Sequence, residues 1–209
     1  MLHVPEKLTF VHVYKTGGTS IERALQAALI GKSFAPILVK NRYLSEATNR
    51  AARAIGYCPA AKHASARAIR ESIGGGAFDQ TFSFGVVRNP WDWQVSLYEY
   101  MRQRPKHFQH QLISGMSFEE YIHWRVDGNF RLQQDYIAEE GPNRVDFVGR
   151  FEELGQVWAR VKGETGIALE LPHLNATKRS SYRKYYTNEL RALVASAFAP
   201  DIEAFGYEF

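Results

Sequence analysis

The sequence is poor in cysteine: Cys58 is the only one among 209 residues, so no internal disulfide bond can form. A fold that is stable without disulfides is typical of a reducing compartment. No segment approaches the roughly 18 consecutive apolar residues of a membrane-spanning helix, and residues 1–7 lack the apolar centre of a signal peptide. We therefore expect a soluble, cytoplasmic and bacterial protein, although a luminal domain trimmed of its anchor would look similar.

The sequence also lacks a large excess of charge. It has 26 lysine and arginine residues against 22 aspartate and glutamate residues, which gives a net charge of +4 and a pI of about 9.1. This balance suits an anionic ligand and is too mild to indicate nucleic acid. Hydrophobic residues make up 45% of the chain, which argues against disorder. The length fits a single domain over residues 1–209, and no repeat or low-complexity linker divides it.

The most informative stretch, Leu8 to Leu29, is typical of a strand, a glycine turn and a helix in succession. Residues 8–13 are apolar and partly β-branched, as in a buried strand. Beyond the turn, apolar residues recur at helical spacing, and Gly31 ends the helix. Glycines let the backbone approach an oxyanion closely, and a helix N-terminus favours negative charge. The pattern predicts an anion-binding loop that consists of Lys15, Thr16, Gly17, Gly18, Thr19 and Ser20.

The lysine of this loop differs in position from the lysine of a Walker A motif, which follows the last glycine. Lys15 precedes the glycines, so its ammonium should enter from the strand and reach the oxygen that bridges a bound phosphate and a transferable group. The string Gly31-Lys32-Ser33 looks like a Walker fragment but follows a helix and lacks the upstream glycine, so we do not interpret it as a phosphate site. The alternative for residues 15–20 is an ordinary strand-to-helix turn.

A second strand-to-helix junction follows Thr81–Val87, where an apolar strand leads into Arg88. Asn89 is a good N-cap, and the proline after it fits the first helical position. Two such junctions predict a parallel sheet whose loops open at the same edge, where ligands bind in such sheets. Arg88 and Ser96 could hold a second phosphate by charge and hydroxyl. The alternatives are an ion pair of Arg88 with Asp92 and a Ser96 that faces solvent.

Two further segments carry candidate functional groups. His63 precedes a predicted helix over residues 64–73, and the dipole at a helix N-terminus favours a neutral imidazole, which can accept a proton. A lone histidine is more often structural than catalytic, so both roles stay open. The segment Lys178–Lys184 combines cations, hydroxyls and an aromatic ring, which suits a loop over a phosphate and a purine. Basic loops are more often simply solvated.

The remaining pattern predicts the elements around these sites. They are a strand at 145–148 and helices at 117–125, 129–140, 154–166 and 187–200. Residues 105–115 should form a loop. Acceptor specificity should depend on residues 103–116 and 129–134.

Four motifs together resemble those of the carbohydrate-type enzymes of sulfotransferase family 2, which use 3′-phosphoadenosine 5′-phosphosulfate (PAPS). They are Lys15-Thr-Gly-Gly-Thr-Ser20, Arg88-Asn-Pro with Ser96, Val148-Gly-Arg-Phe-Glu152, and Tyr185-Tyr-Thr-Asn-Glu-Leu190 with Phe205-Gly-Tyr207. The resemblance extends over nearly the whole chain. It implies an α/β, P-loop NTPase-like three-layer fold with a central, mainly parallel sheet flanked by helices. It also implies transfer of a sulfuryl group to a hydroxyl of an acceptor, such as a glycan or glycolipid.

The resemblance also implies roles for individual residues. Residues 15–20 would bind the 5′-phosphosulfate, and Arg88 with Ser96 would bind the 3′-phosphate. His63 would be the base, a task that a glutamate performs in other members. The segment that closes over the nucleotide would contain Arg179, Ser180 and Tyr182. The product would be 3′-phosphoadenosine 5′-phosphate.

The chemistry can be argued from the residues as well. Sulfuryl transfer places the attacking and leaving oxygens in line, so positioning and charge stabilisation dominate. Because the sulfonate carries one negative charge, protein cations can suffice, and we expect no metal. Lys15 would stabilise the leaving phosphate, and His63 would take the proton of the acceptor hydroxyl.

Two rival functions stay open. The first is a P-loop kinase that phosphorylates a small molecule with ATP and Mg²⁺, although an acidic metal ligand is not evident at the end of a predicted strand. The second is a non-catalytic protein that binds acidic glycans through Lys178–Lys184.

Overall fold

The structure, a computed structural model of the chain, describes residues 1–30, 62–128, 130–137, 144–167 and 181–209. It divides into two compact units. The sheet unit comprises Met1–Val87 and Asp135–Asn175, and the helical unit comprises Arg88–Gln134 and Ala176–Phe209. Our expectation of one domain over residues 1–209 stays a prediction. The predictions for Gly31-Lys32-Ser33, Arg179 and Ser180 lie outside the described residues.

The sheet unit contains a four-stranded sheet in the order β1-β2-β3-β4. β2 (Leu8–Val11) runs parallel to β3 (Phe82–Val87), which runs parallel to β4 (Phe147–Arg150). At the edge, β1 (Leu2–Val4) pairs with β2 in the antiparallel direction. The predicted α/β class and the mainly parallel sheet are confirmed. Since β2 and β3 are parallel neighbours, their carboxyl ends lie at the same edge of the sheet.

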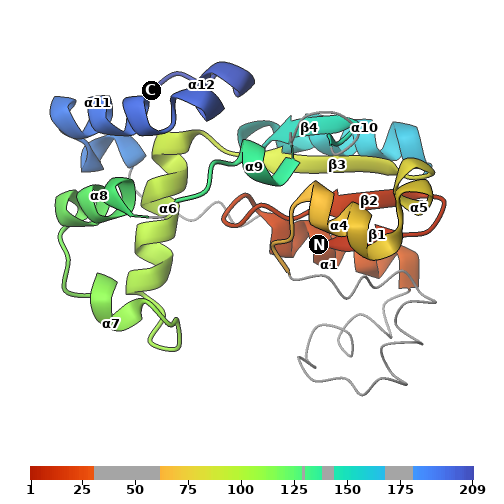
Figure 1. Cartoon of the computed structure of the whole chain (residues 1–209), viewed down its shortest axis with the longest axis horizontal. Helices are drawn as coiled ribbons and strands as arrows, with labels where there is room; N and C mark the ends of the chain where they lie inside the picture. Colours follow the sequence, from red (N-terminus) through yellow and green to blue (C-terminus); the bar gives the residue numbers. More distant parts are fainter. Residues whose placement is uncertain (31–61, 129, 138–143, 168–180) are drawn as a thin grey trace. The chain divides into compact units, whose positions relative to one another are not determined.

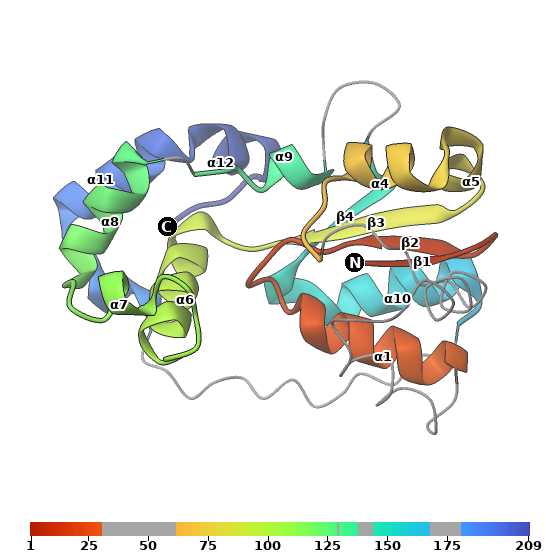
Figure 2. The same ribbon diagram turned by 60° about the horizontal axis from the view of Figure 1, so that its bottom comes forward.

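Helices cover both faces of this sheet (Figures 1 and 2). One face is covered by α1 (Gly18–Ile30) and α10 (Leu154–Thr165). The other is covered by α4 (Ala66–Ile73) and the short α5 (Gly75–Asp79). The sheet unit therefore has three layers.

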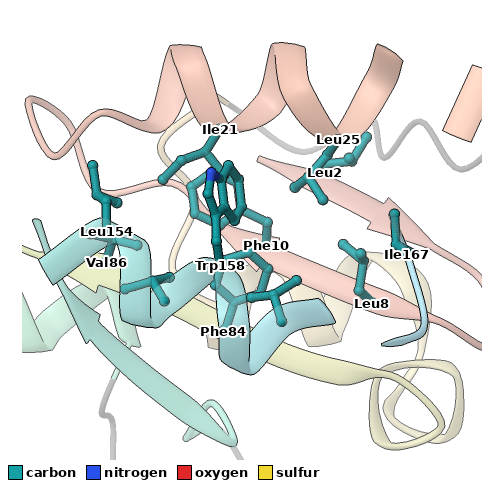
Figure 3. Close-up of a cluster of buried hydrophobic side chains, with 12 residues drawn as sticks. Leu2, Leu8, Phe10, Ile21, Leu25, Phe84, Val86, Leu154, Trp158 and Ile167 are labelled. Carbon is teal, nitrogen blue, oxygen red and sulfur yellow. The ribbon is translucent and has the colours of Figure 1, made fainter. Parts of the chain in front are cut away.

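The core of the sheet unit lies between the sheet and the helices α1 and α10. Figure 3 shows Phe10 and Phe84 of the sheet together with Ile21 of α1 and Trp158 of α10. The two phenylalanine rings are fully buried, with centroids 5.0 Å apart. Burying a large apolar side chain contributes about 1.5–3 kcal/mol. This packing fixes the start of α1 relative to the end of β2, and so fixes the loop between them.

The helical unit is built on α6 (Pro90–Arg102), α8 (Phe118–Asp127) and α11 (Asn188–Ala197), which pack against one another (Figure 1). It also contains α7 (His110–Ile113), the 3₁₀-helix η3 (Tyr182–Tyr185) and α12 (Ala199–Phe205). Its core is largely aromatic. The fully buried Trp93 meets Phe198 edge to face, with centroids 6.0 Å apart.

Some predicted bounds were wrong. The helix expected over 129–140 is reduced, among the described residues, to α9 (Gln134–Ile137). The N–H groups of Gln133 and Gln134 donate to the Asp201 carboxylate and not to carbonyls of a helix. This contact cannot be predicted from the local sequence, because Asp201 lies far along the chain. The third strand starts at Phe147, two residues later than predicted.

Two short helices were not predicted. The expected loop at 105–115 contains α7. Pro200, taken as the end of the last helix, lies instead in the first turn of α12. Proline is well tolerated there because the first N–H groups of a helix have no intrahelical acceptor.

Candidate functional site

The first junction, residues 12–20, connects β2 to α1 and contains the predicted anion-binding loop. The buried Thr16 hydroxyl donates to the Val13 carbonyl at 2.8 Å, so this side chain closes the turn. The Gly17 carbonyl accepts from two N–H groups of the first helical turn, at 2.9 and 3.1 Å. Gly18 and Thr19, the first two residues of α1, have no intrahelical acceptor for their N–H groups. These groups lie at the positive end of the helix, where an anion can bind.

Glycine is required at two positions of this loop, for different reasons. Gly17 has a φ of 82°, in the left-handed region that other residues adopt at a cost. A Cβ at Gly18 would lie 2.0 Å from Cδ2 of His12, so the His12 ring occupies the space that a side chain would need. The absence of a side chain at Gly18 therefore lets the His12 ring pack directly against the start of α1.

Lys15 also has a left-handed backbone, with a φ of 64°, although it is not glycine. Such a conformation costs about 1–2 kcal/mol for a residue with a Cβ. Strain of this kind clusters at functional sites, where the surrounding structure maintains it. The structure thus places the half-buried Lys15 at a strained position, as the first residue of the predicted loop.

His63 belongs to the same unit as this loop. Its Nδ1 lies 2.9 Å from the carbonyl oxygen of His12. A carbonyl can only accept, so Nδ1 carries the proton and Nε2 carries the lone pair. The pKa of His63 is lowered to about 4, mainly by burial; the hydrogen bond to the His12 carbonyl opposes this shift, and the charges of His12 and Lys62 contribute to it. His63 is therefore neutral at pH 7 and can accept a proton at Nε2.

The expected cause of this neutrality was incomplete. We predicted that a helix dipole would favour the neutral ring, but α4 begins only at Ala66, with Ser65 as its N-cap. The largest cause is the burial of His63.

His12 and Glu22 were not predicted as part of the site. The rings of His12 and His63 meet edge to face, with centroids 4.6 Å apart. Nδ1 of His12 lies 3.0 Å from Oε1 of Glu22, which also accepts from the amino group of Met1. Burial lowers the pKa of His12, so its ring is neutral and donates from Nδ1 to the carboxylate. The available signal was a histidine next to an otherwise apolar strand.

A second lysine lies near the loop. Nζ of the exposed Lys62 donates to the Thr19 hydroxyl at 3.4 Å. Thr19 lies in the first turn of α1, so Lys62 adds positive charge at the end of the helix that already favours anions.

The second junction connects β3 to α6 through Arg88 and Asn89. The Asn89 side chain accepts from the N–H groups of Trp91 and Asp92 at 3.1 and 3.4 Å, which confirms the predicted N-cap. Arg88 donates from Nε to Asp92 at 2.7 Å and from Nη1 to the Ser96 hydroxyl at 3.1 Å. The alternative ion pair of Arg88 with Asp92 is present, and Ser96 contacts Arg88; the binding of a phosphate by Arg88 and Ser96 stays a prediction. The largely buried guanidinium is thereby held in one orientation.

A buried amide fixes the backbone of Arg88. The side chain of Gln133 accepts from the Arg88 N–H and donates to the Arg88 carbonyl, both at 2.8 Å. The Asp201 carboxylate in turn accepts from the Gln133 N–H at 2.7 Å. Gln133 is fully buried, so this residue of the expected acceptor loop serves Arg88 and not a ligand.

Tyr182, predicted to lie over the nucleotide, begins η3 in the helical unit. Its half-buried ring meets Phe209 edge to face, with centroids 5.6 Å apart. The structure thus places His63 against His12 in the sheet unit, which also contains residues 15–20, and it brings Arg88 and Ser96 together in the helical unit.

The described residues contain neither a candidate metal site nor a helix that could span a membrane. Within those ranges, no group of three or more histidine, cysteine, aspartate or glutamate residues could hold a metal ion. None of the helices described here is long and apolar enough to cross a membrane.

A mainly parallel sheet, a helix N-terminus beside lysine and a neutral histidine are together typical of proteins that bind a tetrahedral anion and act on it. A sequence model of the Sulfotransferase family matches residues 3–208. The chain therefore belongs to the sulfotransferase family, and this membership supports sulfotransferase activity in general. No curated protein matches the sequence.

Proposed function

We propose that this protein is a PAPS-dependent O-sulfotransferase that acts on a hydroxyl of a carbohydrate acceptor, such as a glycan or glycolipid. Sulfotransferases generally use PAPS as the donor. The observation that carries the proposal is the first junction, where the N–H groups of Gly18 and Thr19, the charge of Lys15 and a neutral His63 belong to one unit. We assign the three-layer sheet unit to the P-loop NTPase-like group of folds, on the basis of this loop and the parallel sheet.

The two junctions bind different ends of the donor in this proposal. Residues 15–20 bind the 5′-phosphosulfate through backbone N–H groups and the Lys15 ammonium. Arg88 and Ser96 bind the 3′-phosphate, a role supported by the 3.1 Å hydrogen bond between them, since it keeps both side chains close together. Arg179, Ser180 and Tyr182 close over the nucleotide.

The transfer uses an in-line displacement at sulfur. The acceptor oxygen forms a bond to sulfur while the bond from sulfur to the bridging oxygen of the 5′-phosphate breaks, and the electron pair stays on that oxygen. Lys15 stabilises the charge that develops there. The hydroxyl proton goes to Nε2 of His63, whose Nδ1 proton is held by the His12 carbonyl.

The donor also matters for the basicity of His63. In the free protein the pKa of His63 is about 4, which is low for a base that works at neutral pH. A polyanion bound beside Lys62 opposes the positive charge that lowers this pKa. We therefore expect His63 to become a better base when the donor is bound.

The decisive experiment measures transfer of labelled sulfate from PAPS to a panel of glycans, glycolipids and simple alcohols. We expect transfer by the wild type to at least one hydroxyl acceptor, and losses for Lys15→Ala and His63→Ala. Undiminished transfer in either variant would refute the role of that residue.

A binding measurement separates this proposal from its rivals. Metal-free 3′-phosphoadenosine 5′-phosphate at 100 times its Kd should stabilise the fold by about 2.7 kcal/mol. Stabilisation by ATP with Mg²⁺ alone would favour a small-molecule kinase instead. Salt-sensitive binding of acidic glycans that survives Lys15→Ala, with no transfer, would favour a non-catalytic binder.

A further inference from the structure

His12 lies at the centre of the sheet unit's candidate site, and three neighbours hold its ring. Glu22 of α1 accepts from Nδ1 at 3.0 Å. The start of α1 packs against the opposite side of the ring, because a Cβ at Gly18 would lie 2.1 Å from Nε2. The third neighbour is His63, whose ring meets it edge to face at 4.6 Å between centroids. Only 2% of His12 is exposed, so the ring has little freedom to move.

We propose that His12, anchored by Glu22, is a positioning residue that holds the His63 ring and the N-terminus of α1 in a fixed arrangement. This inference rests on the proposed function and extends it to two residues that do not touch the substrates. The His12 carbonyl selects the Nδ1–H tautomer of His63. The His12 ring then fixes the direction in which the lone pair of Nε2 points.

The anchoring by Glu22 is what distinguishes this arrangement from ordinary packing. Burial raises the pKa of Glu22, but the hydrogen bond from His12 and the nearby amino group of Met1 outweigh it, so the carboxylate stays charged. A charged acceptor makes a shorter and stronger hydrogen bond than a neutral one. His12 is therefore held to α1, the same helix whose N-terminus belongs to the anion-binding loop.

Two variants of His12 separate its ring from its hydrogen bond. His12→Phe keeps a flat ring against Gly18 and His63 but loses the donor to Glu22. His12→Asn keeps a donor but loses the ring. Because a misplacement of about 1 Å can cost 10²-fold in rate, we expect each to lower kcat by about 10-fold to 100-fold, with KM changed less than 3-fold.

His3→Gln is the matched control. His3 is also buried, also has a pKa lowered by burial, and also makes one side-chain hydrogen bond, to Thr9 at 2.9 Å. It should leave kcat unchanged within 2-fold. An equal loss in His3→Gln would show that general destabilisation, and not positioning, explains the His12 variants.

A second readout does not depend on activity. The ¹⁵N shifts of the His63 ring should report the Nδ1–H tautomer in the wild type. His12→Phe keeps the backbone carbonyl of residue 12 but loses the anchor to Glu22, so the His63 ring can turn away from that carbonyl and the shifts should report a mixture of tautomers. Glu22→Gln keeps the shape of the side chain and serves as a second variant if the His12 variants do not fold. It should also give a mixture of His63 tautomers, with a smaller share of the Nε2–H form than in His12→Phe.

The outcomes distinguish the inference from the function on which it rests. A wild type that transfers no sulfate overturns the proposed function, while the ¹⁵N shifts still decide the inference. An active wild type whose His12 and Glu22 variants keep both kcat and the His63 tautomer overturns the inference alone.

Discussion

The two strand-to-helix junctions differ in whether a side chain accepts from the first N–H groups of the helix. At the second junction, the side chain of Asn89 satisfies N–H groups of α6. At the first junction, glycine stands at the start of α1, and the His12 ring fills the space where a side chain would be. N–H groups at the start of α6 therefore have an acceptor within the protein, whereas those at the start of α1 can donate to a ligand.

This difference suggests that the first junction binds the group that reacts and the second binds a group that does not. A backbone site at a helix end surrounds a small anion closely, which suits the group that changes during the reaction. A capped helix can contribute only side chains, and Arg88 with its fixed orientation suits a group that is held and not transformed. Variants of the first junction should therefore affect kcat, and variants of the second should affect binding.

The largest expected effect is that of Lys15→Ala. Loss of the ammonium removes stabilisation of the leaving phosphate, so kcat should fall by about 10²-fold to 10³-fold, as for removal of one oxyanion donor. Initial rates at saturating PAPS measure it. Lys7→Ala, which removes an exposed lysine between β1 and β2, is the control. A kcat within 3-fold of the wild type would contradict the assignment of the first junction to the transferred group.

Arg88→Gln should act on affinity. A hydrogen bond to a charged group contributes about 1.5–3 kcal/mol, so the Kd for 3′-phosphoadenosine 5′-phosphate should rise by about 10-fold to 100-fold. The ion pair with Asp92 favours the lower end, because Arg88 already has a carboxylate partner. Isothermal titration calorimetry measures the change, with Arg102→Gln at the end of α6 as control.

A second ligand makes this comparison specific. Adenosine 5′-phosphate lacks the 3′-phosphate. Its Kd should therefore be the same for Arg88→Gln and for the wild type. Equal weakening of both ligands would place Arg88 at another part of the nucleotide.

The sequence predicted the first junction well because its signals are local. Glycines, a lysine and a helical period lie within one stretch from Leu8 to Leu29, and each acts on its own neighbourhood. The same holds for the predicted N-cap Asn89, which the structure confirms, and for the helix predicted from residue 117, which begins with a capping box of Ser117 and Glu120.

The contacts that orient the functional groups were not predictable in this way. His63 and His12 are 51 residues apart, and Gln133 and Arg88 are 45 apart. Such pairs depend on how the chain folds back, which neither period nor spacing encodes. From the sequence, Gln133 was predicted to belong to a helix and to the acceptor site. Its buried partner, Asp201, lies far along the chain and could not be recognised from local patterns.

Acid should act on the first junction through the buried His63. The pKa of His63 is about 4 in the folded state against an ordinary 6.5, so its contribution to stability is complete above pH 6.5 and is lost as the pH falls toward 4. His63→Gln should therefore lose less stability than the wild type between these values. Urea unfolding at several pH values measures this, with the exposed His123→Gln as control. An unchanged pH dependence in His63→Gln would show that His63 is not buried as a neutral ring.

The smallest expected effect tests whether Asn89 satisfies N–H groups at the start of α6 when no ligand is bound. Asn89→Ala should lower the free energy of unfolding by about 1 kcal/mol through loss of the cap, and more if the bond from its Nδ2 to the Glu208 carbonyl contributes. Asn89→Asp keeps the capping acceptor but loses that donor, so the two contributions separate. Thr19→Ala, at the start of α1, should change stability by less than about 0.5 kcal/mol, because its hydroxyl is exposed. Equal losses for Asn89→Ala and Thr19→Ala, measured in urea without nucleotide, would remove the contrast between the two junctions.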